Sequence, residues 1–208
     1  GSPGALRLFI APLSKEVSWL LHLALFSILL LLLGTRLRWP LEPKHQAMVL
    51  WGGWLWVGGV FFSIANFFHE YYLSMLAPPL ACLAAIGVVE LWRLREQHRW
   101  LGMALLLAAA GGTLRFQVMT ASAFMSKIAW LPLALSLLAA GGALLIVSAV
   151  GRKLGSVALV GLACVVAAIL VTPGIWSGLT TLNASENQSL PSAYGGRPSG
   201  PVNSGGLQ

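Results

Sequence analysis

The stretch FFSIANFFHEYYLSMLAPPLACLAAIGVVELW, residues 61–92, joins the end of one apolar run to the whole of the next. A histidine, a glutamate and two tyrosines, His69 to Tyr72, separate the two runs. About 20 apolar residues are enough to cross the roughly 30 Å hydrocarbon core of a bilayer as a helix. The second run therefore predicts a transmembrane helix from Leu73 to Trp92, with polar residues at its mouth.

The same criterion finds five more runs on either side of this one. The six expected spans are residues 17–35, 47–66, 73–92, 100–119, 128–150 and 156–178. They lack the period-2 alternation of barrel strands, and a helix satisfies its own backbone hydrogen bonds in lipid. The composition, 57% hydrophobic and 9% charged, is also typical of a membrane protein. The sequence predicts an all-α, polytopic membrane helix bundle with about six transmembrane helices.

The polar segments indicate how the bundle is oriented and divided. Lysine and arginine cluster in alternate loops, which marks those loops as cytoplasmic and argues against nucleic-acid binding despite the net charge of +7. Both ends and the His69–Tyr72 cluster are then extracytoplasmic. We expect an interfacial segment at 1–16, a transmembrane domain at 17–178 and a flexible tail, rich in Gly, Ser, Asn and Pro, at 179–208. The chain does not begin with Met or a cleavable signal, so further spans are expected upstream.

Few side chains offer chemistry. The sequence has no aspartate, and of its six glutamates only Glu16 and Glu70 fall near helix ends on the outer side. No phosphate loop of the Walker type, nucleophile elbow or zinc motif is present. Arg115 and Lys127 flank one outer loop and are interpreted as interface anchors.

The His69–Tyr72 cluster allows two interpretations. Tyrosine and histidine are common at membrane interfaces, so the cluster could be part of an aromatic belt. Alternatively, His69, Tyr71 and Tyr72 could donate hydrogen bonds to an anionic lipid headgroup at the end of a helix. Pro78 and Pro79 are expected to kink the helix that follows.

Several blocks in order along the chain, GSPGALRLF, SWLL, LLWGGWL and FFHEYYLSMLAPPLACLAAIGV, support the second interpretation. Together they resemble the carboxy-terminal half of the membrane domain of bacterial family 39 glycosyltransferases. These enzymes have the GT-C fold and include ArnT-like enzymes, relatives of the protein O-mannosyltransferases and a mannosyltransferase group. One position departs from the pattern, because many members have Pro where this chain has Glu70, which leaves the role of Glu70 open.

The resemblance implies an enzyme of the bacterial inner (plasma) membrane, a hexosyltransferase. It would transfer a sugar from a polyprenyl-phosphate donor to an acceptor on the extracytoplasmic face. The family's catalytic aspartate would lie upstream of residue 1, so this chain would contribute donor binding without the catalytic base. Expected partners are the lipid donor, membrane lipids and the amino-terminal half of the same enzyme.

The donor-binding residues implied are His69, Tyr71, Tyr72, Arg7 and Glu70. For Arg7 the alternative is an arginine that extends to the membrane interface. A divalent metal ion near the donor phosphate is left open. Two other functions are a non-catalytic assembly subunit and a transporter-like helix bundle, although a transporter typically carries ionisable groups near the middle of the bilayer.

Overall fold

The computed structural model describes residues 3–34, 39–151, 155–184 and 193–195. Within these ranges the chain is helical, and no strand is present. The elements are η1 (Arg7–Phe9), α1 (Ser14–Val17), η2 (Ser18–Leu20), α2 (Leu21–Gly34), α3 (Pro43–Ile64), η3 (Glu70–Leu76), α4 (Ala77–Gln97), α5 (Arg99–Ser122), α6 (Leu131–Val150) and α7 (Gly155–Leu182), where η denotes a 3-10 helix.

Six helical segments are long and apolar enough to cross a membrane. They are Ser14–Gly34, Pro43–Ile64, Glu70–Gln97, Arg99–Ser122, Leu131–Val150 and Gly155–Leu182. Each overlaps one expected span, so the prediction of an all-α membrane bundle with about six transmembrane helices is confirmed. Its assignment to the GT-C fold stays a prediction.

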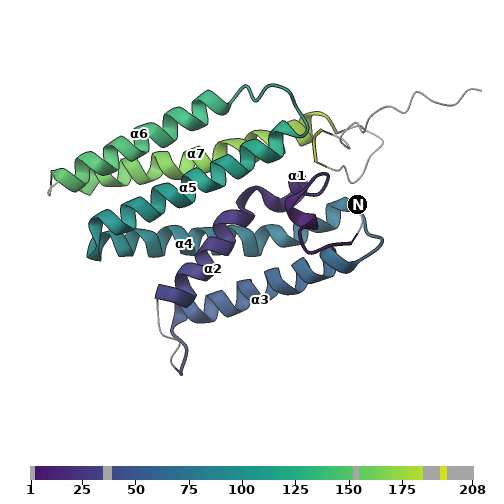
Figure 1. Ribbon diagram of the computed structural model, residues 1–208, viewed down its shortest axis with the longest axis horizontal. Coiled ribbons are helices and arrows are strands. Elements are labelled where there is room, and N and C mark those ends of the chain that lie inside the picture. Colours follow the sequence, from purple (N-terminus) through teal and green to yellow (C-terminus); the bar gives the residue numbers. More distant parts are fainter. Residues whose placement is uncertain (1–2, 35–38, 152–154, 185–192, 196–208) are drawn as a thin grey trace, which may run out of the picture.

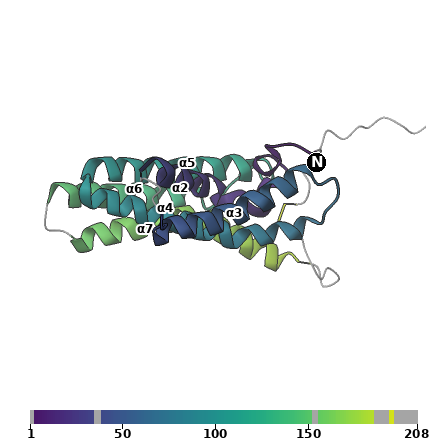
Figure 2. The same ribbon diagram turned by 90° about the horizontal axis from the view of Figure 1, so that it is seen from below.

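The helices lie side by side in an elongated bundle, with α3 along one edge and α6 along the other (Figure 1). α4 occupies the middle and packs against α2, α3 and α5, while the consecutive helices α6 and α7 share the most extensive contact. α3 is the least covered span, with only 17% of its apolar window buried. A view at right angles shows α5 along one face of the bundle (Figure 2).

Small residues allow α6 and α7 to approach closely. A Cβ atom added to Gly141 would lie 2.7 Å from the carbonyl oxygen of Gly161, and one added to Gly161 would lie 3.0 Å from the oxygen of Gly141. Any larger side chain at either position would separate the two backbones. The glycines therefore serve helix packing, as is usual in membrane helices.

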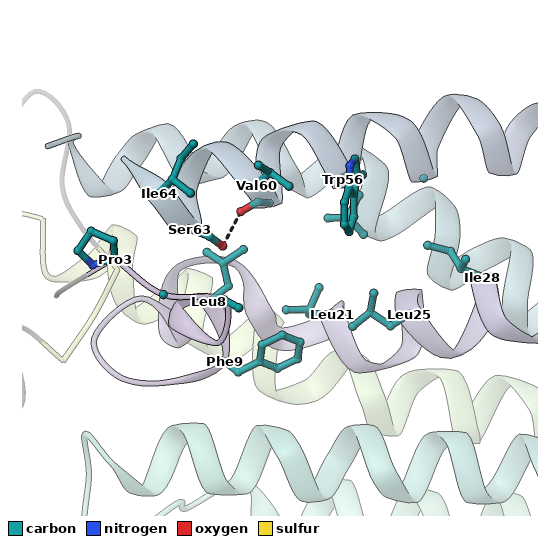
Figure 3. Close-up of a pocket in the computed structure, with 15 residues that line it drawn as sticks. Pro3, Leu8, Phe9, Leu21, Leu25, Ile28, Trp56, Val60, Ser63 and Ile64 are labelled. Atoms are coloured by element: carbon teal, nitrogen blue, oxygen red, sulfur yellow. Dashed lines mark hydrogen bonds between the residues drawn. The ribbon is translucent and has the colours of Figure 1, made fainter. Parts of the chain in front are cut away.

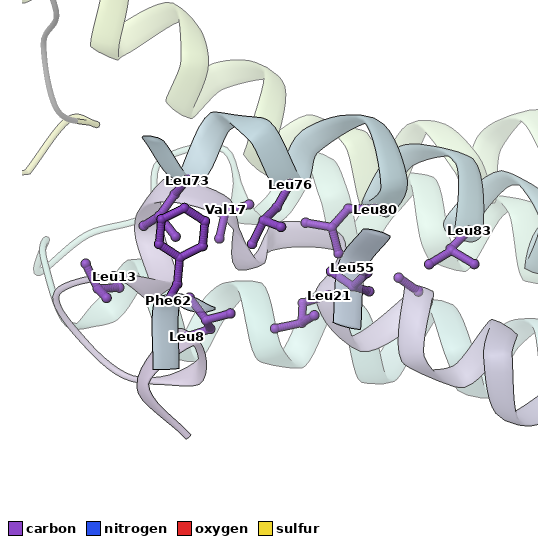
Figure 4. Close-up of a cluster of buried hydrophobic side chains, with 11 residues drawn as sticks. Leu8, Leu13, Val17, Leu21, Leu55, Phe62, Leu73, Leu76, Leu80 and Leu83 are labelled. Carbon is purple, nitrogen blue, oxygen red and sulfur yellow. The ribbon is translucent and has the colours of Figure 1, made fainter. Parts of the chain in front are cut away.

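A cluster of buried apolar side chains attaches the amino-terminal segment to the bundle. Leu8, Leu13 and Val17 from this segment pack with Phe62 of α3 and with the leucines of η3 and α4 (Figure 4). A backbone hydrogen bond from Gly4 N to Ser63 O, 2.9 Å long, adds to the attachment. Residues 3–20 are thus fixed at one end of the bundle, beside the beginning of η3.

The end of the chain differs in part from the expected tail. α7 continues to Leu182, beyond the boundary expected at residue 178. Ala193 and Tyr194 also make hydrogen bonds, to Glu16 and to Thr180 respectively, so they pack against the bundle. The expectation of a flexible tail stays a prediction for residues 185–192 and 196–208, which lie outside the described residues.

Candidate functional site

The polar cluster begins a 3-10 helix rather than an α-helix. η3 directly precedes α4, and Pro78 accounts for the last turn of η3, because proline has no N–H with which to close an α-helical bond to the carbonyl of Ser74. The N–H of Ala77 donates to that carbonyl instead, three residues along. A 3-10 helix has three residues per turn, so side chains repeat their direction at every third position. The consecutive residues His69 to Tyr72 consequently point in three directions.

One of these directions faces away from the bundle. His69, Tyr72 and Met75, each three residues apart, are exposed. The ring of His69 stacks on that of Tyr71, with centroids 5.3 Å apart and an angle of 12°, and meets Tyr72 edge to face at 5.8 Å. His69 and Tyr72 therefore form an exposed aromatic surface and do not line the cavity described below.

Arg7 is buried, with an exposed fraction of 7%. Its guanidinium donates hydrogen bonds to the carbonyl oxygens of Phe62, at 3.2 Å, and Ala65, at 2.6 Å, and lies 4.8 Å from the ring centre of Phe68. These carbonyls belong to the end of α3 and the residues after it, where helix geometry leaves acceptors without partners. The structure therefore gives Arg7 a role in closing the end of α3. Its expected contact with a donor phosphate stays a prediction.

Glu70 and Tyr71 line a polar cavity of about 450 Å³. Its walls come from α1, η2, η3, α7 and the tail, and its lining residues are Lys15, Glu16, Trp19, Glu70, Tyr71, Ser74, Pro173, Trp176, Ser177, Thr180, Thr181 and Ala193. Of the five residues predicted to bind the donor, the structure thus brings two together here. We call this the polar cavity.

Lys15 and Glu16 form an ion pair at the cavity wall, with Nζ 3.2 Å from Oε1. Both also hold Ala193 of the tail. The ammonium of Lys15 donates to the carbonyl oxygen of Ala193, and the carboxylate of Glu16 accepts the Ala193 N–H at 2.9 and 3.1 Å. Lys15 is almost fully buried, with 1% of its surface exposed, so these contacts compensate its desolvation. The main chain at Ala193 thereby covers the charged groups of Lys15 and Glu16 in the cavity.

Aromatic rings form another wall. Trp19 and Trp176 contact each other with centroids 4.9 Å apart, and both line the polar cavity. The rings of Phe124, Trp130 and Tyr194 meet Trp176 edge to face at 6.0–6.3 Å. The position of Trp176 is therefore fixed by packing on several sides.

Gln117 of α5 connects the helices behind this wall. Its side-chain amide donates to the carbonyl of Ile169 at 2.8 Å and to that of Trp19 at 3.1 Å. Ile169 needs such a donor, because the residue four positions on is Pro173, which has no N–H. Gln117 thus supplies the hydrogen-bond donor that is missing from α7 at Pro173, and it fixes the aromatic wall relative to α5.

A divalent metal ion near the donor phosphate stays a prediction. In the described ranges no three His, Cys, Asp or Glu side chains come close enough to hold one. Two carboxylates, Glu16 and Glu70, line the cavity, but Glu16 already has a cation beside it in Lys15. The lining of the cavity combines two carboxylates, several hydroxyls and two indole rings.

Sequence reasoning did not select Lys15, Glu16 or Trp19 as site residues. One indication of Glu16 was present in the sequence, because Glu16 and Glu70 are the two glutamates expected near outer helix ends. They are separated by 54 positions, so the sequence does not show that they meet. Only the packing of the amino-terminal segment against η3 brings both to one cavity.

A second, larger cavity of about 660 Å³ lies between α2 and α3. Leu21, Leu25 and Ile28 line one side and Trp56, Val60 and Ile64 the other, with Leu8, Phe9 and Pro3 at one end (Figure 3). Ser63 also lines this cavity, and its hydroxyl donates to the carbonyl of Gly59 within its own helix (Figure 3). We call this the apolar cavity. Residues 8–21 contribute to both cavities.

Two curated proteins of Bacillus subtilis (strain 168) are similar to part of the chain. "Putative mannosyltransferase YycA" is 41% identical over 133 residues, which are 62% of this chain and 19% of that protein. "Putative mannosyltransferase YkcB" is 49% identical over 102 residues, 48% of this chain and 14% of that protein. The chain therefore spans less than a fifth of the length of either relative. No family model matches the chain, and no solved structure does. The chain is thus similar to a short part of two proteins that are named as putative mannosyltransferases.

Proposed function

We propose that the chain is part of an integral-membrane glycosyltransferase that transfers a hexose from a polyprenyl-phosphate donor to an acceptor on the extracytoplasmic face. The polar cavity holds the head of the donor. The observation that carries this proposal is the meeting of Glu70 and Tyr71 with Lys15, Glu16 and Trp19 around one cavity at the end of the bundle. The names of the two relatives support the choice of mannose as the first sugar to test.

The cavity's composition fits a sugar ring. Carboxylates accept hydrogen bonds from sugar hydroxyls, and the Tyr71 hydroxyl can both donate and accept. The hydroxyls of Ser74 and Thr180 already donate to main-chain carbonyls and can serve as acceptors. Trp19 and Trp176 also line the cavity, where they are almost fully buried against each other and form a rigid apolar wall. Glu70 and Tyr71 contribute from η3, and Trp176 and Thr180 contribute from α7.

Lys15 supplies positive charge for the phosphate. When the anomeric carbon is attacked, the lipid phosphate leaves with developing negative charge, which a nearby cation stabilises. In the structure the Lys15 ammonium donates to the carbonyl of Ala193, so the lipid phosphate has to displace Ala193 from Lys15. Glu16, released from the Ala193 N–H, is then available to a sugar hydroxyl.

The apolar cavity accommodates part of the lipid chain. It opens between two membrane-spanning helices, and apolar side chains form most of its lining. Apolar surface buried against an isoprenoid contributes roughly 25 cal/mol per Å². The amino-terminal segment would then contact the chain of the donor on one side and its head on the other.

We place the catalytic base outside these 208 residues. The sequence has no aspartate, and the Glu16 carboxylate is already engaged by the Lys15 ammonium and by the Ala193 N–H. The residues of the polar cavity therefore bind and orient the donor, and the acceptor hydroxyl is deprotonated elsewhere.

Donor binding tests the proposal directly. Full-length protein in lipid nanodiscs is titrated with radiolabelled polyprenyl-phosphate mannose, and the dissociation constant is compared among variants. Glu70→Gln and Lys15→Met are expected to weaken binding about tenfold or more, since a hydrogen bond to a charged group contributes roughly 1.5–3 kcal/mol. Glu96→Gln, which alters an exposed glutamate near the far end of α4, is the matched control and should bind as the parent does.

Two outcomes would contradict the assignment. If Tyr72→Phe weakens binding while Tyr71→Phe does not, the exposed aromatic surface holds the donor and the polar cavity does not. If Glu70→Gln and Lys15→Met both bind the donor like the control, the cavity is not the donor site.

A further inference from the structure

Ala193, Tyr194 and Gly195 form a short segment at the wall of the polar cavity. Ala193 lines the cavity, and all three residues are half-buried. We call this segment the strap. Both polar groups of the Ala193 main chain are bound, the carbonyl oxygen by the ammonium of Lys15 and the N–H by the carboxylate of Glu16. The strap is thus held by the two charged side chains of the cavity.

The next two residues attach the strap to α7 and to the turn after α5. The Tyr194 N–H donates to Oγ1 of Thr180 at 3.0 Å, and the Tyr194 ring meets that of Trp176 edge to face at 6.0 Å. Gly195 has a φ of 101°, which residues with a side chain rarely adopt, and a Cβ atom added there would lie 3.1 Å from Cβ of Phe124. The strap therefore requires glycine at this position, and its three residues are placed together.

The contacts at Ala193 use the groups that the proposed function assigns to the donor. Lys15 has only 1% of its surface exposed, so a phosphate can reach its ammonium only after Ala193 has moved. A phosphate oxygen carries charge and is a stronger acceptor for an ammonium than a main-chain carbonyl. A sugar hydroxyl can also donate to Glu16 in place of the Ala193 N–H. The strap and the head of the donor thus compete for the same two side chains.

The closed arrangement does not satisfy every polar group that it encloses. The indole N–H of Trp176 is buried and has no hydrogen-bond partner in the part of the chain that the structure describes. A buried donor without an acceptor is unfavourable. Tyr194 is one of the rings that enclose this indole, so its departure gives a ligand or water access from that side. The strap is therefore suited to opening.

We propose that the strap is an autoinhibitory contact, which closes the polar cavity while no donor is bound and moves away as a unit when the donor phosphate binds Lys15. This inference rests on the proposed function, in which the polar cavity holds the head of the donor. Without a ligand, closure compensates the desolvation of Lys15 and Glu16. The consequence is a lower affinity for the donor, because only the open fraction of the protein can bind it.

The substitution Gly195→Ala tests the strap from outside the cavity. Gly195 does not line the polar cavity, and alanine is strained at its φ, so the substitution weakens closure and leaves the lining side chains unchanged. We expect full-length Gly195→Ala protein in lipid nanodiscs to bind polyprenyl-phosphate mannose about fivefold or more tightly than the parent. Gly178→Ala is the matched control and should bind as the parent does, because Gly178 is exposed on α7 and an added Cβ atom there meets nothing within 4 Å.

Hydrogen exchange, resolved to single residues by mass spectrometry, follows the strap without a substitution. The N–H groups of Ala193 and Tyr194 are both hydrogen-bonded in the closed arrangement. Saturating donor is expected to speed exchange at both about tenfold or more, whereas a ligand that left the strap in place would slow it or leave it unchanged. The Asn183 N–H, which donates to Leu179 at the end of α7, is the internal control and should not change.

The results distinguish failure of this inference from failure of the proposed function. If Glu70→Gln weakens donor binding but Gly195→Ala binds no more tightly than Gly178→Ala, the donor site stands and the strap is not inhibitory. Exchange at Ala193 and Tyr194 that saturating donor leaves unchanged or slows overturns the inference in the same way. If Glu70→Gln binds the donor as the parent does, the proposed function fails and the inference fails with it.

Discussion

The contact between Gln117 and the interrupted helix α7 makes a sharp prediction about stability. Replacing Gln117 with Met keeps a straight side chain of similar length but removes both donors, to Ile169 O at 2.8 Å and to Trp19 O at 3.1 Å. Since Pro173 has no N–H, the carbonyl of Ile169 is then buried without a donor, which costs roughly 1–3 kcal/mol. The Gln117 oxygen is itself buried and has no hydrogen-bond partner among the residues that the structure describes, so its removal returns part of this amount. We expect a net loss of about 2 kcal/mol in the free energy of unfolding.

Reversible unfolding in mixed detergent micelles, followed by tryptophan fluorescence, measures this loss. Gln46→Met is the matched control, because Gln46 also donates to a main-chain carbonyl, that of Leu41 at 2.7 Å, but on an exposed surface. It should change stability by no more than about 0.5 kcal/mol.

A double-mutant cycle with Pro173→Ala isolates the cause. Alanine restores the N–H that can donate to Ile169, so the Gln117→Met substitution should cost about 1 kcal/mol less in the Pro173→Ala background. If the two substitutions add to within about 0.3 kcal/mol, Gln117 does not compensate for the proline and the reasoning is refuted.

Three further predictions concern packing and the ends of the chain. Gly141→Val should destabilise the protein by several kcal/mol in the same assay, because its Cβ would lie 2.7 Å from a backbone oxygen of α7, whereas Gly53→Ala, with nothing within 4 Å, should not. Ala193→Pro removes the N–H that Glu16 accepts and should increase the acylation rate of Lys15, measured by mass spectrometry; an unchanged rate would mean that the tail does not cover this lysine. Arg7→Met leaves the end of α3 without its donors and should speed hydrogen exchange in residues 61–66, and protection equal to the parent's would count against this role.

The four consecutive side chains of His69–Tyr72 do not point to one site in the structure. Sequence reasoning placed all four side chains at the mouth of a helix, which is where they lie. It did not foresee that the chain forms a 3-10 helix here, in which His69 and Tyr72 share one direction and Tyr71 and Ser74 share another. These four residues therefore contribute both to an exposed aromatic surface and to one wall of the polar cavity.

Composition and apolar run length were sufficient to predict the helices of this protein. In lipid the backbone must bond within each span, so long apolar runs leave the chain no other regular structure, and six such helices are found. The polar cavity was decided only by tertiary packing. Lys15 and Glu16 meet Glu70 and Tyr71 because Leu13 and Val17 bury themselves against η3 and α4, and Trp176 joins them because Gln117 fixes α7. Apolar contacts are not directional, and a single sequence does not show which apolar faces pack against each other. The polar residues that meet in the cavity are therefore determined only when the helices pack.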